Sequence, residues 1–65
     1  MANLIEGLNA ELSRNREILK IYESIPEGRF GAVMIKQTIK MAEKAIAEND
    51  IVAMVRACKE LQSTQ

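Results

Sequence analysis

Three lysines recur at four-residue intervals in the middle of the chain: Lys36, Lys40 and Lys44. Residues four apart lie on one face of a helix, so these side chains form a basic ridge that could meet phosphate groups. No aromatic side chains interleave to stack on bases, Glu43 lies beside the ridge, and Glu48 is spaced to pair with Lys44. A solvated helix face is therefore the preferred interpretation, and a small nucleic-acid-binding regulator that uses the ridge as a dimer is the alternative.

The other reactive side chains give little support for catalysis or metal binding. The 65 residues include no histidine and a single cysteine, Cys58, so the usual general base at neutral pH is missing and a zinc site would lack its ligands. Because Cys58 falls on an apolar helix face, inert packing is favoured over a redox role. We therefore expect a protein that is not an enzyme and that has no catalytic residues, no metal site and no cofactor.

Four residues of the predicted helices could serve either packing or recognition. Asn15 falls inside an apolar stripe, where a buried amide would need partners and could fix the register of a helix pair. At the edge of the stripe the same amide would point to solvent, and the sequence leaves both positions open. Met34, Met41 and Met54 could line a pliable groove, but their helical spacing favours packing in the core.

Helical periodicity predicts an all-α fold, a three-helix domain that spans residues 1–65. The helices are expected at about residues 3–24, 31–48 and 51–62. The second helix is apolar over nearly half its circumference, which is typical of a helix with two neighbours. The expected core faces of the first and third helices are Leu4, Leu8, Leu12, Leu19 and Tyr22, and Ile51, Met54, Val55, Cys58 and Leu61.

A loop containing Pro26, Gly28 and Gly31 separates the first two helices. The second helix could begin anywhere between Ile25 and Gly31. We favour the later start, because two glycines in an opening turn cost about 1 kcal/mol each relative to alanine. The second and third helices should form a tight antiparallel hairpin, since Asn49 tolerates the left-handed conformation that ends a helix and Asp50 can cap the next one.

The unequal helix lengths predict an interface. At 1.5 Å per residue the helices are about 33, 27 and 18 Å long, so the third should cover only the early half of the first and the late half of the second. A group of apolar residues is left at the other end, near the proline: Ile18, Ile21, Ile25, Phe30 and Met34. We expect a second copy, with a dimer favoured, or another protein to cover this patch, unless the loop folds back and buries it within the monomer.

Charge and hydropathy bear on partners and location. Nine basic residues balance nine acidic ones, so no overall field attracts nucleic acid or an anionic membrane. No leader-like segment is evident, and no apolar run approaches the roughly 20 residues needed to cross a bilayer. With a lone thiol, these features indicate a cytoplasmic protein without a membrane partner.

Several segments together resemble short uncharacterised helical proteins of bacteria and their phages. They are the run from Asn15 to Pro26, the triplet Phe30-Gly31-Ala32, the segment from Ala42 to Ala47, and Asp50. The resemblance covers most of the chain and implies a small accessory protein, without an activity to transfer. Together with the apolar patch, it favours a non-enzymatic protein–protein interaction module or accessory subunit that self-associates.

Overall fold

The computed structural model describes residues 2–64 and has three α-helices, α1 (Ala2–Glu23), α2 (Arg29–Ala47) and α3 (Ile51–Gln62). A single 3-10 turn, η1 (Pro26–Gly28), links the first two helices. The predicted all-α, three-helix fold is confirmed, and the first and third helices lie within one residue of their expected ranges. Met1 and Gln65, the ends of the predicted domain, lie outside the described residues.

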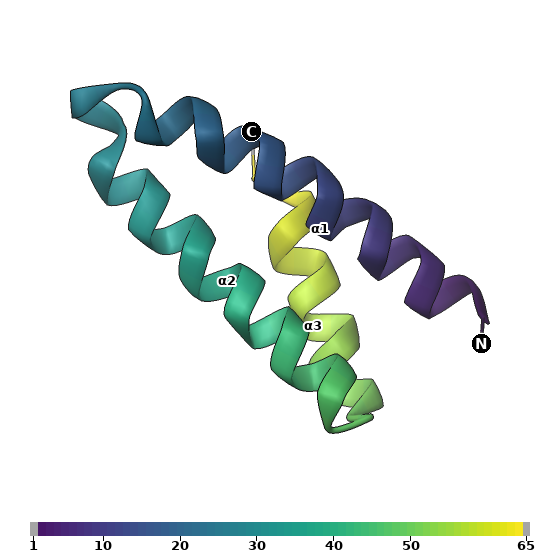
Figure 1. Cartoon of the computed structure of the whole chain (residues 1–65). Helices are drawn as coiled ribbons and strands as arrows, with labels where there is room; N and C mark the ends of the chain where they lie inside the picture. Colours follow the sequence, from purple (N-terminus) through teal and green to yellow (C-terminus); the bar gives the residue numbers. More distant parts are fainter. Residues whose placement is uncertain (1, 65) are drawn as a thin grey trace.

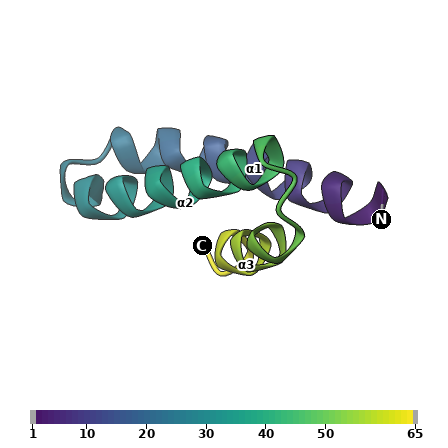
Figure 2. The same cartoon turned by 90° about the horizontal axis from the view of Figure 1, so that it is seen from below.

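The three helices form two layers. α1 and α2 run antiparallel from the proline turn and diverge away from it, and α3 lies behind their wider half (Figure 1). A view from below places α3 on one side of the α1–α2 hairpin, under the half that lies away from the turn (Figure 2). The molecule is accordingly elongated, at 38 × 16 × 16 Å. The half of the hairpin nearest the turn consists of two helices only, as the helix lengths predict.

The core lies where all three helices meet. Leu8 and Leu12 of α1 are at most 2% exposed, which confirms part of the predicted stripe, and the other stripe residues pack around them half-buried. Ala42 and Ala45 of α2 are buried as well, and their small side chains allow α3 to approach closely. The buried hydrophobic cluster consists of Leu8, Leu12, Ile35, Ile39, Ala42, Ala45, Met54, Ala57 and Leu61.

The buried face of α3 differs from the predicted one. Met54 and Leu61 are fully buried as expected, but the third buried residue is Ala57, and Cys58 is only half-buried. Ile51 and Val55 are 51% and 41% exposed, so their assignment to the core was wrong. The helix is rotated because its small residues, Ala57 among them, face the hairpin and permit close packing there. That rotation turns the branched side chains toward the rim.

The start of α2 lies within the range that the sequence left open, but the helix begins at Arg29 and not at the favoured Gly31. Gly28 in the turn and Gly31 in the first turn of α2 are both needed for close packing against Tyr22, a tertiary contact that helix propensity does not reflect. A Cβ at Gly28 would lie 2.6 Å from the Tyr22 carbonyl oxygen, and one at Gly31 would lie 2.6 Å from the Tyr22 ring. Pro26 opens the 3-10 turn, whose Gly28 N–H donates to the Ile25 carbonyl at 2.9 Å.

The connection between α2 and α3 has the predicted chemistry. Asn49 adopts a left-handed conformation, with φ of 55°, and its N–H donates to Ile46 O at 3.1 Å. The Asp50 N–H donates to Ala45 O at 2.9 Å, which completes a Schellman motif at the end of α2. The Asp50 carboxylate then accepts from the Ala53 N–H at 3.2 Å and caps α3. This tight connection positions α3 against the half of the α1–α2 hairpin that lies away from the proline turn.

Candidate interaction surface

Five apolar side chains near the turn form what we call the proline-end surface: Ile18, Ile21, Ile25, Phe30 and Met34. Phe30 is 77% exposed, and Ile21, Ile25 and Met34 are 58%, 44% and 51% exposed. Ile18 is half-buried and packs against the core. The loop therefore does not fold back over these side chains. Four large apolar residues remain in contact with solvent at one end of the molecule.

The helical register places part of this surface on the same side of the hairpin as α3. On α1, Asn15 bonds to α3, and Ile18 follows three residues later on the same face. On α2, Met41 borders a small hollow with Ala53 of α3, and Met34 precedes Met41 by seven residues, about two turns. Ile18 and Met34 therefore continue the α3-facing side of the hairpin toward the turn, where Figure 2 shows no third helix.

The methionines do not behave as a group. Met54 is fully buried, as core packing predicts, whereas Met34 and Met41 are 51% and 54% exposed. The core packing that their helical spacing favoured was wrong for both, because α3 is too short to reach Met34 and meets α2 through its alanines. The helix lengths had instead placed Met34 in the uncovered apolar patch, where it is exposed. The edge of the wide apolar arc on α2 is thus uncovered.

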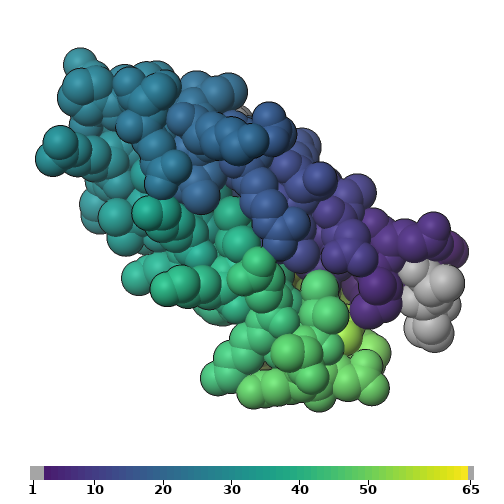
Figure 3. All heavy atoms as spheres, in the orientation of Figure 1, coloured from purple at the N-terminus to yellow at the C-terminus, as the bar shows by residue number. Residues whose placement is uncertain are grey.

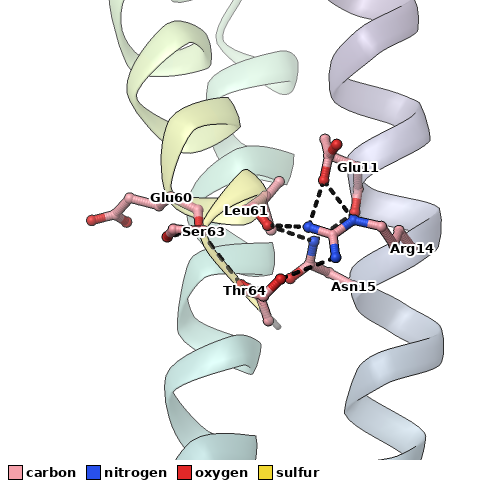
Figure 4. Close-up of polar contacts among 7 residues, drawn as sticks. All are labelled: Glu11, Arg14, Asn15, Glu60, Leu61, Ser63 and Thr64. Atoms are coloured by element: carbon pink, nitrogen blue, oxygen red, sulfur yellow. Dashed lines mark hydrogen bonds and ion pairs between the residues drawn. The ribbon is translucent and has the colours of Figure 1, made fainter.

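Asn15 is the one buried polar side chain of the described residues, at 0% exposure, which settles its position in the stripe. Its Nδ2 donates to Glu11 O at 2.8 Å and to Leu61 O in α3 at 3.1 Å (Figure 4). Its Oδ1 accepts no hydrogen bond from residues 2–64. One side of the amide therefore ties α1 to the last turn of α3, while the other side is unsatisfied.

Arg14 completes this contact, a role that its sequence position did not reveal. The guanidinium donates to Leu61 O at 2.7 Å and to Thr64 O at 3.0 Å, and it is held by Glu11 at 2.9 Å (Figure 4). A cation at the carboxyl end of a helix is favourable because unsatisfied carbonyls concentrate negative charge there. Arg14 and Asn15 therefore fix the end of α3 against the middle of α1.

The lysine ridge is exposed but largely compensated by acidic neighbours. Lys36 pairs with Glu23 of α1 at 3.1 Å, and Lys44 lies 4.0 Å from Glu48. Lys40 alone among the three has no ion-pair partner within residues 2–64. The ridge thus offers one uncompensated cation, and not three, to an approaching phosphate.

No deep cleft accompanies these features in the described part of the chain. Seen from the side opposite α3, α1 and α2 abut along the half nearest the turn, and part of α3 is visible where they diverge (Figure 3). A shallow hollow of about 380 Å³ is lined by Glu23, Arg29, Ala32, Val33 and Lys36. Within this lining Glu23 and Lys36 form an ion pair. A nucleophile with an adjacent base is not found in this lining, so the geometry supports no particular reaction there.

Three further observations describe residues 2–64. No group of three or more histidine, cysteine, aspartate or glutamate side chains is arranged to hold a metal ion. None of the helices has the length and apolar character that crossing a membrane requires. Cys58 is a half-buried free thiol that packs against the core.

Comparison of the chain with protein-family models, with curated proteins and with solved structures finds no match. Any account of function therefore depends on the surface geometry described above.

Proposed function

We propose that this chain is a non-enzymatic interaction module or accessory subunit that self-associates through the proline-end surface. The observation that carries the proposal is the exposure of Phe30, at 77%, beside three other large apolar side chains on the hairpin half that α3 leaves open. A folded monomer gains little from holding such side chains in water, whereas a partner that covers them gains the hydrophobic free energy of their burial.

The size of the surface suits a dimer contact. Taking about 200 Å² for one whole side chain, the exposed fractions of Ile21, Ile25, Phe30 and Met34 amount to roughly 450 Å² of apolar area. A standard interface buries about 800 Å² per partner, of which about 500 Å² is apolar. The proline-end surface could therefore supply most of the apolar part of such an interface.

The total surface points the same way. The chain exposes 4685 Å², whereas a compact monomer of its 7.3 kDa mass is expected to expose about 4200 Å². The elongated shape accounts for the excess, because one half of the molecule is only two helices thick. Pairing two copies over that half would remove the excess.

Sedimentation equilibrium from low to high micromolar concentration tests the proposal. The wild-type chain is expected to shift from monomer to dimer. Phe30→Glu is expected to remain monomeric, because each copy would place one carboxylate in the apolar contact. Val52→Glu is the matched control, since Val52 is also well exposed, at 64%, but lies on α3. It should associate like the wild type.

A wild-type chain that remains monomeric throughout this range would exclude self-association. Equal loss of association in Phe30→Glu and Val52→Glu would show that the contact is not confined to the proline-end surface. Far-UV circular dichroism of both variants guards against misfolding, which is not expected at exposed positions.

A further inference from the structure

We propose that the second copy docks antiparallel over only half of the hairpin, so that the proline turn of each copy lies beside the carboxyl end of α3 of the other. This inference rests on the self-association proposed above and adds the arrangement of the two copies. The occupant of the open face is thus the same open face of a second copy, related by a two-fold axis that passes between the two hairpins.

The position of α3 excludes the other simple arrangement. α3 projects from the face of the hairpin that also carries Ile18 and Met34. A second hairpin stacked in parallel on that face, with its turn over the first turn, would occupy the space that α3 already fills. An antiparallel hairpin that overlaps only the open half avoids this clash, because its own α3 then lies beyond the first proline turn.

The helix lengths place the two-fold axis near Met34. α1 and α3 contain 22 and 12 residues, so the open half is about 15 Å long and its midpoint lies about 7.5 Å from the turn. Met34 lies five residues into α2, at about that distance. Met34 of one copy should therefore face Met34 of the other, and Phe30 should lie near the middle of the partner hairpin.

The charges around the two ends suit this contact. Glu27 lies in the turn and Arg29 directly after it, and neither forms an ion pair with another residue of the described chain. The last turn of α3 likewise carries Lys59 and Glu60 without ion-pair partners there. Each end offers both signs of charge, so a turn placed beside the end of α3 in a second copy meets complementary groups and no net repulsion.

Spin-label distances measure the arrangement directly. In a Cys58→Ser background, nitroxide labels at Ala47→Cys should be about 40 Å apart in the dimer, since Ala47 lies 13 residues beyond Met34 in each copy. Parallel stacking would bring the same labels to within roughly 20 Å, because the far ends of the two hairpins would then lie side by side. A short distance at Ala47 would overturn the proposal.

Disulfide formation supplies a second measurement with a matched control. Met34→Cys should oxidise rapidly to a covalent dimer, because facing Cα atoms near the axis lie within the range that a disulfide needs. Val33→Cys is equally exposed, at 52% against 51%, but its side chain points about 100° away around α2. It should cross-link slowly. A faster reaction at Val33 than at Met34 would also overturn the arrangement.

The outcomes separate this inference from the proposed function. A wild-type chain that never dimerises removes the proposed function, and this inference with it. A dimer that is abolished by Phe30→Glu but shows a short Ala47 distance retains the proposed function and removes only the antiparallel half-overlap.

Discussion

The lack of space beside Gly28 in the proline turn predicts that a single methyl group added there destabilises the fold. Gly28 has φ of −88° and ψ of 1°, which alanine adopts without strain, so backbone conformation does not require glycine there. The added Cβ would nevertheless lie 2.6 Å from the Tyr22 carbonyl oxygen, where ordinary contact begins near 3.4 Å. Gly28→Ala must therefore displace backbone at the end of α1.

The expected cost follows from these distances. Forcing an extra methyl group into a packed site costs about 1–3 kcal/mol. The smaller entropy of the unfolded alanine variant offsets about 0.4–1 kcal/mol of this. We expect Gly28→Ala to lower the free energy of unfolding by about 1–2 kcal/mol, which corresponds to a fall in Tm of about 5–15 °C for a domain of this size.

Gly7→Ala is the matched control. Gly7 lies in α1, and a Cβ added there would meet nothing within 4 Å. Because glycine inside a helix is less favourable than alanine, Gly7→Ala should raise the free energy of unfolding by about 0.5–1 kcal/mol. The same chemical change should thus have opposite signs at the two positions.

Thermal and urea unfolding followed by far-UV circular dichroism measure both effects. All samples should be at one low concentration, because dimer formation would raise Tm by mass action. A Gly28→Ala variant as stable as the wild type would refute the reasoning, since it would mean that the turn can move away from Tyr22 at no cost. The packing explanation for the early start of α2 would then fail.

Two further predictions concern the ends of α3. Asn15→Leu should be within about 1 kcal/mol of wild-type stability or above it, because it removes the unsatisfied Oδ1 while Leu61 O still accepts from Arg14 and from Thr64. Asn15→Ala should lose about 1–2 kcal/mol, because it leaves a cavity. Urea unfolding measures both variants, and a more stable alanine variant would contradict this prediction. Asp50→Ala should lose about 1 kcal/mol by removing the cap on the Ala53 N–H, and Asp50→Asn should lose much less, which amide hydrogen exchange at the start of α3 would resolve.

The sequence was sufficient for the layout of the fold because its local signals agree. The apolar stripe of α1, the Asn49-Asp50 boundary and the proline turn each act within a few residues of the chain, so their physics can be worked out without knowing the neighbours. The exposure of Phe30 could be anticipated for a similar reason, since it follows from helix lengths alone.

Features that depend on contacts between helices could not be predicted in this way. The early start of α2 depends on Tyr22 filling the space above two glycines, and the rotation of α3 depends on Ala57 facing the hairpin. The role of Arg14 was hidden because its partners, Leu61 and Thr64, lie 47 and 50 residues away. A backbone carbonyl has no sequence signature, so a side chain that binds one cannot be recognised before the helices are placed.

The polar residues Arg14 and Asn15 in the middle of α1 and the uncovered face of the α1–α2 hairpin have one physical origin. The last carbonyls of a helix lack the usual intrahelical partners, and in α3 that of Leu61 lies against α1, where water has limited access. Arg14 and Asn15 add side-chain donors at Leu61 O, which also accepts from the Thr64 N–H, so α3 can stop at the middle of α1. Had α3 continued about 15 Å further, it would have covered the surface around Ile18 and Met34, and apolar residues in α1 would have sufficed. The unsatisfied Oδ1 of Asn15 is the cost of ending the helix there, and the apolar surface beyond that end is what remains available to a second copy.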